Sequence, residues 1–196
     1  RAFAGGSGIV TSALCFGGEV PPGETASAVT ESWNGSTWTE VNDLNTGRRL
    51  MGSAGADNTS ALVFGGNVPP DTAATESWNG TNWTEVNDLN NATQSLGGAG
   101  TQTLAVAFGG SPSLVDTEFW NGTNWSNDQD MNTGRQSMGS AGSATLADAY
   151  ATAVNVMGFE KGVEFVNSND IAALFIVTDK GELKLIKSQK WYDLGL

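Results

Sequence analysis

Histidine is absent from the 196-residue chain. Its absence excludes the most common general base in enzymes and every serine–histidine–aspartate type of catalytic site. A single cysteine, Cys15, excludes an intramolecular disulfide. Cys15 lies in the apolar run 13–16, far in sequence from any basic residue, so we expect a packed side chain and not a reactive thiol.

Long apolar runs are missing as well. No segment approaches the roughly 18 residues that identify a membrane-spanning helix, and residues 1–10 lack the charged-then-apolar pattern of a secretory signal. We therefore expect no insertion into a membrane. Because residue 1 is an arginine and not a methionine, we also expect that further sequence precedes it in the natural protein.

Basic side chains are few, with 9 Lys and Arg against 21 Asp and Glu and a net charge of -12. This charge repels phosphate backbones, so nucleic acid is not an expected partner. Lysine is absent from residues 1–154, whereas residues 155–196 contain five lysines. The contrast predicts two regions, a domain over 1–152 and a separate tail over 153–196.

Glycine, in contrast, is abundant, and its positions repeat along the chain. Phe-Gly-Gly occurs three times at spacings of 48 and 44 residues, and each copy precedes a Glu-x-Trp-Asn-Gly segment and a second tryptophan. This period divides the chain into repeat units at 1–47, 48–92 and 93–134 and a partial fourth unit at 135–152.

The recurring aromatic residues and double glycines are predicted to form the packed core of the repeat units. They are Phe16, Gly17, Gly18, Trp33, Trp38, Phe64, Gly65, Gly66, Trp78, Trp83, Phe108, Gly109, Gly110, Trp120 and Trp125. Because every unit contains the same two tryptophans, we favour packing between neighbouring sheets over a stacking platform for a sugar.

Each unit is predicted to form four short antiparallel strands, so the fold class is all-β. The glycine-rich first strand is expected innermost, where sheets converge, and the uninterrupted apolar run 61–64 is expected to be covered on both faces. The Asn-Gly pairs that follow Trp33, Trp78 and Trp120 predict type I′ turns, in which both central residues have positive φ.

The double glycine, the later aromatic residue and the following tryptophan resemble the kelch repeat, with Trp33, Trp78 and Trp120 in the usual place of tyrosine. The amino-acid sequences of segments 31–35, 44–48 and 97–103 are similar to kelch-like repeats in virion proteins of marine bacteriophages. The resemblance covers residues 1–152. It implies β-propeller blades that serve as a binding scaffold, with contacts made by the loops at one end.

The pattern departs from the kelch family in the fourth unit. A closed propeller typically has four to eight blades, and here the fourth unit keeps only its first strand at 139–142 and an apolar strand that Asp148 interrupts. Segments 171–177 and 182–186 then predict a hairpin. This hairpin could complete a fourth blade, pair with another chain, or pack with residues 163–166. Open sheet edges predict assembly into a larger multimer.

Candidate chemistry is sparse. Glu31, Glu76 and Glu118 recur with the fold and do not form a unique catalytic pair, so we expect no enzyme. The copper site of galactose-oxidase-type propellers needs histidine, and we expect no cofactor. The oxygen side chains at 42–43, 87–88 and 128–130 leave calcium as an option, although hydrogen bonds within turns explain them better.

These expectations combine into a non-enzymatic phage virion protein, structural or part of a fibre, that presents a propeller-like surface. Its expected location is the virion, and its expected partners are other virion proteins or copies of itself, and a glycan or protein of the host surface. The alternative is a secreted or cell-surface carbohydrate-binding propeller module of a bacterium.

Overall fold

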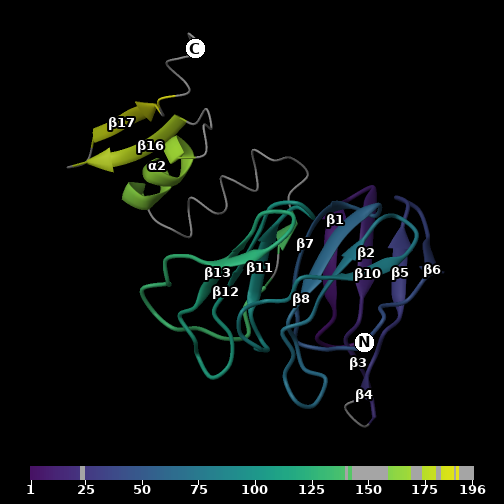
Figure 1. Cartoon of the computed structure of the whole chain (residues 1–196). Helices are drawn as coiled ribbons and strands as arrows, with labels where there is room; N and C mark the ends of the chain where they lie inside the picture. Colours follow the sequence, from purple (N-terminus) through teal and green to yellow (C-terminus); the bar gives the residue numbers. More distant parts are fainter. Residues whose placement is uncertain are drawn as a thin grey trace. The chain divides into compact units, whose positions relative to one another are not determined.

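The computed structural model of the chain describes residues 1–22, 25–139, 141–142, 159–168, 174–179, 182–187 and 189 (Figure 1). Two compact parts divide the chain, Arg1–Thr152 and Ala153–Leu196. We call the first part the repeat body and the second part the tail, and describe each by itself.

Each of the first three repeat units forms four antiparallel strands of one sheet, and the predicted all-β class is confirmed. The first sheet contains β1 (Gly5–Ile9), β2 (Ser12–Phe16), β5 (Thr30–Trp33) and β6 (Trp38–Val41). The second sheet contains β7 (Gly52–Asp57), β8 (Ser60–Phe64), β9 (Thr75–Trp78) and β10 (Trp83–Val86). The third sheet contains β11 (Gly97–Gly100), β12 (Ala105–Phe108), β13 (Thr117–Trp120) and β14 (Trp125–Asn127).

The first strands of the units lie together on the inside of the repeat body. β1 contacts β7, β7 contacts β11, and the short strand β15 (Ala141–Gly142) contacts all three. β15 is the first strand of the fourth unit, but it pairs in parallel with β11 as a fifth strand of the third sheet. Within the described residues the fourth unit therefore contributes one inner strand and no sheet of its own.

Small residues allow the inner strands to approach so closely. A Cβ atom on Gly98 of β11 would lie 2.6 Å from Phe64 Cζ and 2.7 Å from the carbonyl oxygen of Ser53 in β7. The Ser53 hydroxyl in turn donates a hydrogen bond to the Gly6 carbonyl of β1, at 2.9 Å. Glycine and serine at these places let neighbouring backbones pack directly.

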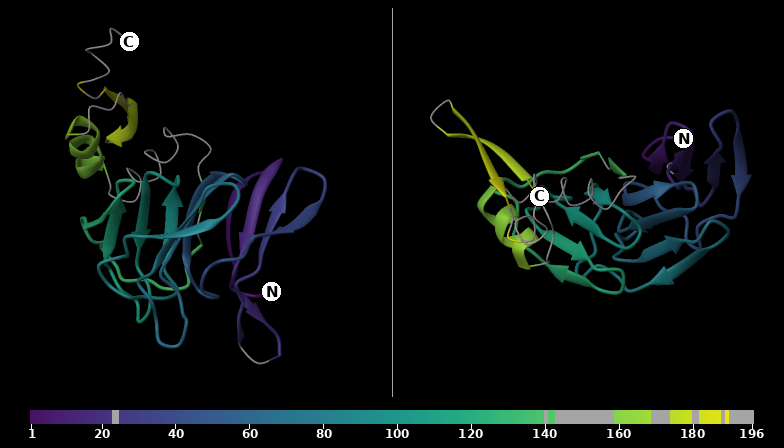
Figure 2. Two further views of the ribbon diagram at one scale, coloured as in Figure 1. Left: turned by 45° about the vertical axis from the view of Figure 1, so that its right-hand side comes forward. Right: turned by 90° about the horizontal axis from the view of Figure 1, so that it is seen from above.

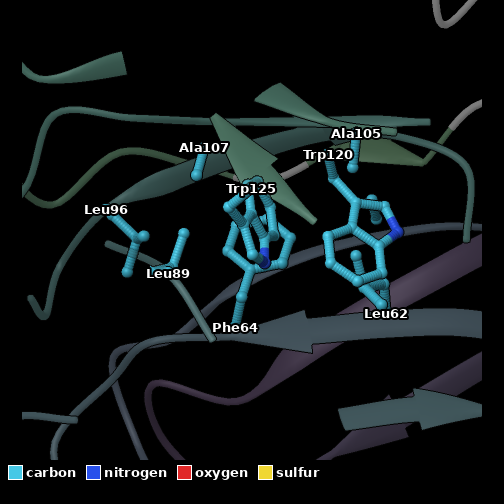
Figure 3. Packing of buried hydrophobic residues seen from close by; sticks show 9 residues of the cluster. Leu62, Phe64, Leu89, Leu96, Ala105, Ala107, Trp120 and Trp125 are labelled. Carbon is cyan, nitrogen blue, oxygen red and sulfur yellow. The ribbon is translucent and has the colours of Figure 1, made fainter. Parts of the chain in front are cut away.

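The core lies between neighbouring sheets. All four residues of the run Ala61, Leu62, Val63 and Phe64 are fully buried, which confirms that β8 is covered on both faces. Leu62 and Phe64 pack against residues of the third sheet, and the Phe64 and Trp125 rings meet edge to face with centroids 4.9 Å apart (Figure 3). Ala61 and Val63 belong to the cluster shared with Phe16 of the first sheet.

The prediction of type I′ turns at the Asn-Gly pairs is wrong. Trp33 pairs with Trp38, so the loop has four residues, and only the glycine of the pair has positive φ, 91° at Gly35. The Asn34 side-chain oxygen accepts hydrogen bonds from the backbone N–H groups of Ser36 and Thr37, both at 2.9 Å. Asparagine acts here through its side chain, because it closes the loop as an Asx turn.

Longer loops follow each Phe-Gly-Gly and connect the second strand of a sheet with the third. In the first unit this loop carries a two-stranded ribbon, β3 (Glu19–Val20) and β4 (Thr25–Ala26), seen at the lower edge of the repeat body in Figure 1 and in the left view of Figure 2. Both glycines at 17–18 have positive φ, 64° and 95°, so the chain leaves the sheet through a bend that favours glycine at two successive positions.

The tail contains a helix, α2 (Phe159–Ser168), and a hairpin of β16 (Leu174–Asp179) and β17 (Glu182–Lys187). The two strands pair antiparallel at the place where the sequence predicts a hairpin. Residues 163–166, considered above as a partner for this hairpin, belong to α2, where Val166 is buried. The helix was not predicted, because its polar and apolar residues alternate over too few positions to separate a helix from a strand.

Candidate functional site

Arg48 and Glu76 are the most deeply buried charged residues described in the repeat body, and 1% of each is exposed. Arg48 lies in the segment 42–51 that connects β6 with β7, and its Nη2 atom lies 2.7 Å from Glu76 Oε1. Its Nη1 atom donates hydrogen bonds to the carbonyls of Ala74 and Gly65. Burial lowers the pKa of Arg48, and Glu76 opposes that lowering. Arginine nevertheless stays charged.

The glutamate at the position of Glu76 is held by the preceding connecting segment in the second and third units, and by Arg1 in the first unit. Glu76 accepts hydrogen bonds from Asn45 through its backbone N–H at 2.8 Å and its side-chain amide at 3.1 Å. Glu118 accepts the same two bonds from Asn90, at 2.8 and 2.9 Å. Glu31 pairs with Arg1. The recurring glutamates therefore have a structural role, because their carboxylate oxygens accept hydrogen bonds or form ion pairs within the repeat body.

The second tryptophan of each later unit docks on the preceding sheet. The indole N–H of Trp83 donates to the Thr30 hydroxyl, and that of Trp125 donates to the Thr75 hydroxyl, both at 3.1 Å. Trp83 also meets the Phe16 ring edge to face at 4.9 Å, as Trp125 meets Phe64. Each of these contacts joins one sheet to the next, which is the packing role expected for the tryptophans.

The first and third sheets each have one side where this pattern is incomplete. On the first sheet, Trp38 is 49% exposed, although its equivalents Trp83 and Trp125 are buried. On the third sheet, Phe108 is only half-buried, and the buried hydroxyl of Thr117 has no hydrogen-bond partner among the described residues. The other core residues predicted from the sequence are thus brought together in the middle of the repeat body, whereas Trp33 and Trp38 lie at one end and Phe108 lies at the other.

The oxygen side chains considered for calcium serve the backbone. Asp43 Oδ1 accepts a hydrogen bond from the Thr30 N–H, and Asp88 Oδ1 accepts one from the Thr75 N–H, both at 3.1 Å. In the part of the chain that the structure describes, no three Cys, Asp or Glu side chains are grouped so as to hold a metal ion. Hydrogen bonding within the units accounts for these aspartates.

The loops after Phe-Gly-Gly all leave the same end of their sheets, and they differ most between the units. They span 17–29, 65–74 and 109–116. Exposed prolines occur in all three loops, at Pro21, Pro22, Pro69, Pro70 and Pro112. An ion pair between Arg49 and Glu19 fixes the first loop to the second unit. This loop end offers side chains that the packing between sheets does not require.

Cys15 is half-buried, so the expectation of a packed thiol holds only in part. The fold also brings a basic group to it, because Arg1 Nη2 lies 3.7 Å from the sulfur.

A cavity of about 370 Å³ lies at the inner strands, lined by residues 4–8 with Met51, Ser53, Met138 and Gly139. The residues that line it are glycine, alanine, serine and methionine, so the lining is uncharged and includes no acid–base group.

Sequence reasoning missed Asn45 and Arg48 as the residues of the connecting segment that bind Glu76. The available signal was the recurrence of Asn and Arg in the connecting segments, at 45 and 48 and again at 132 and 135. The predicted apolar strand of the fourth unit, with Asp148 and Tyr150, lies outside the described residues.

No family model matches the chain, and a search of curated proteins finds no match. Among the described residues, no helix has the length and apolar character needed to cross a membrane.

Proposed function

We propose that the chain is a non-enzymatic structural or fibre protein of a phage virion, in which kelch-like propeller blades carry a binding surface at their loop end. The observation that carries the proposal is the use of the recurring polar side chains. Arg48 and Asn45 both bind Glu76, and Asn90 binds Glu118 as Asn45 binds Glu76. Because these recurring polar side chains form contacts that hold the sheets in place, they support the function of a scaffold protein.

The same contacts argue against catalysis. A glycosidase needs two carboxylates that face a substrate across a cleft. Glu76 and Glu118 are buried, each within its own contact between sheets, and each accepts several hydrogen bonds. Neither carboxylate faces an open surface.

The blade interpretation is supported by the arrangement of the inner strands. Sheets of four antiparallel strands follow one another along the chain, and their glycine-rich first strands lie in mutual contact. Propeller blades have this order of strands and this innermost position of the first strand. The assignment to a virion depends on the resemblance of the repeat sequence.

The loop end is the proposed recognition surface. Its three loops have different lengths and sequences, whereas the strands repeat, and functional residues are concentrated on loops held by a rigid scaffold. Exchanging the loop 65–74 for the loop 109–116 should therefore leave the fold intact and change binding to the natural host cells.

Two measurements test this function. Mass spectrometry of purified particles should find the protein in virions, and genes for portal, capsid or tail proteins should lie beside its own. A gene that stands alone and carries a secretion signal, together with absence of the protein from purified particles, would contradict the proposal.

A second candidate function, carbohydrate binding, is favoured by one observation. The half-exposed Trp38 lies beside Trp33, with ring centroids 5.5 Å apart and an angle of 39° between their planes. Exposed aromatic faces can stack on sugar rings. A glycan array that detects binding which Trp38→Ala abolishes would favour this candidate, and an array without any bound glycan would exclude it.

A further inference from the structure

The two complete contacts between sheets are built from the same five residue types: threonine, phenylalanine, tryptophan, asparagine and glutamate. A threonine hydroxyl and a phenylalanine ring of one sheet receive a tryptophan of the next: Thr30 and Phe16 receive Trp83, and Thr75 and Phe64 receive Trp125. An asparagine and its neighbours in the connecting segment receive a glutamate, Glu76 or Glu118. One hairpin supplies both incoming groups, β9–β10 or β13–β14.

The third sheet and the segment 128–138 that follows it present the receiving groups a third time. We call this surface the open interface and define it by Phe108, Thr117, Asn132, Arg135 and Gly139. The alignment of the units places Thr117 with Thr30 and Thr75, Phe108 with Phe16 and Phe64, and Arg135 with Arg48. Within the described residues of the repeat body, no hairpin occupies the open interface.

Thr117 is the clearest sign that a group is missing. Only 2% of the residue is exposed, and its hydroxyl has no hydrogen-bond partner among the described residues. Both equivalent threonines receive an indole N–H. A buried hydroxyl without a partner is unfavourable, so the site fits a donor that arrives from outside the sheet.

The other groups of the open interface show the same deficit. Phe16 and Phe64 are fully buried under a tryptophan, whereas Phe108 is half-buried. Arg48 is buried in its ion pair, whereas Arg135 is exposed, and its guanidinium has no partner in the described part of the chain.

Space is also free at the inner edge. A Cβ atom on Gly52 would lie 2.4 Å from the Phe64 ring, and one on Gly97 would lie 2.4 Å from the Phe108 ring. At Gly139, the equivalent position of the fourth unit, nothing lies within 4 Å. The open interface therefore has room at its inner edge as well as unsatisfied groups further out.

We propose that the open interface is a docking site for a β-hairpin of the form Thr-Glu-x-Trp-Asn-Gly-x-x-Trp, supplied by a partner chain. The second tryptophan of the hairpin donates its indole N–H to Thr117 and covers Phe108. The glutamate is bound by Arg135 and by Asn132 through its backbone N–H and side-chain amide. The inference stands on the contacts between sheets and holds whether or not the protein belongs to a virion.

Charge and residue chemistry select this partner. Arginine together with two amide donors recognises a carboxylate, and a buried hydroxyl beside an aromatic ring recognises an indole.

The experiment uses the full chain and a synthetic peptide with the sequence of residues 73–87, which contains the hairpin β9–β10. An isolated hairpin is barely stable in water, so the peptide should fold as it binds. Calorimetric titration should show saturable binding with one peptide per chain. In the peptide, Glu76→Gln and Trp83→Ala should each weaken binding about tenfold or more, and Ser77→Ala should leave it unchanged.

Variants of the full chain locate the site. Arg135→Met and Thr117→Val remove groups of the open interface, and each should weaken peptide binding by about tenfold. Arg49→Met is the matched control, since Arg49 pairs with Glu19 in the loop end and should not affect the peptide. Circular dichroism checks that all variants are folded.

Three outcomes decide the question. Saturable binding that Arg135→Met and Thr117→Val weaken supports the proposal. Light scattering that finds a dimer which the peptide dissociates also supports it and identifies a second copy of the chain as the source of the hairpin. Absence of saturable binding, or binding that both variants leave unchanged, overturns it.

Discussion

The interface between the second and third sheets and the open interface of the third sheet are made from equivalent residues in opposite states. At the first, Phe64 is fully buried and Thr75 holds the indole of Trp125. At the second, Phe108 is half-buried and the Thr117 hydroxyl is unpaired among the described residues. The comparison shows that the repeat sequence specifies half of each contact, and the neighbouring unit specifies the other half.

The largest effect that can break this comparison is expected from Trp83→Ala. Trp83 is buried, meets Phe16 edge to face and donates to Thr30, so its removal leaves a cavity and an unpaired hydroxyl. We expect the free energy of unfolding to fall by about 4–5 kcal/mol, measured by urea titration. Trp38→Ala, at the exposed equivalent position, should cost less than about 1 kcal/mol. Equal losses would refute the distinction.

Glu76→Ala should come next. The change leaves Arg48 buried without its carboxylate, although the carbonyls of Ala74 and Gly65 still accept its hydrogen bonds. We expect a loss of about 3 kcal/mol in the free energy of unfolding. The control is Glu31→Ala, since the side chain of Glu31 is 40% exposed against 2% for Glu76, and it should cost about 1 kcal/mol or less. A control as costly as Glu76→Ala would show that exposure does not decide the effect.

A smaller effect is expected from Gly52→Ala. The new Cβ atom would lie 2.4 Å from the Phe64 ring, and neither Gly52 nor its equivalent Gly139 has positive φ, so the comparison is purely one of space. Gly52→Ala should cost about 1–3 kcal/mol by overpacking. Gly139→Ala should change stability by about 0.5 kcal/mol or less, because nothing lies within 4 Å. Thermal unfolding followed by circular dichroism suffices here.

The smallest change in stability is expected from replacing the threonine that receives the tryptophan, and this change compares the two interfaces most directly. Thr75→Val removes the acceptor of the Trp125 indole and should cost about 1–2 kcal/mol. Thr117→Val removes a buried hydroxyl that is unpaired within the described residues, and should be neutral or slightly stabilising in the free chain. A clear loss of stability in Thr117→Val would mean that the hydroxyl already has a partner in solution.

Much of the fold could be predicted because the same sequence pattern recurs in each repeat unit. The period of Phe-Gly-Gly, the apolar run 61–64 and the paired tryptophans give four strands per unit, and β8 is buried on both faces as expected. The turn at Asn34 was predicted wrongly because Asn-Gly is common both in two-residue turns and in Asx turns. Only the length of the loop separates the two.

The candidate site was much less accessible to sequence reasoning. Asn45 and Glu76 are 31 positions apart, and Trp83 and Thr30 are 53 apart, so nothing in the local pattern joins them. The helix α2 was missed as well, because ten residues give too short a periodic signal. The contact between Arg1 and the sulfur of Cys15 was missed for a similar reason, since the two residues meet only in the folded chain.

The sequence by itself determined which residues recur and which strands they form, because strand periodicity and glycine geometry act over a few neighbouring positions. Only the tertiary structure decided which copy of each residue is satisfied. Thr75 and Thr117 have nearly the same sequence around them, yet one lies beneath a tryptophan and the other beneath none among the described residues. Burial and hydrogen bonding depend on contacts between units. Equivalent residues therefore differ in their burial and hydrogen bonding where the array of sheets ends.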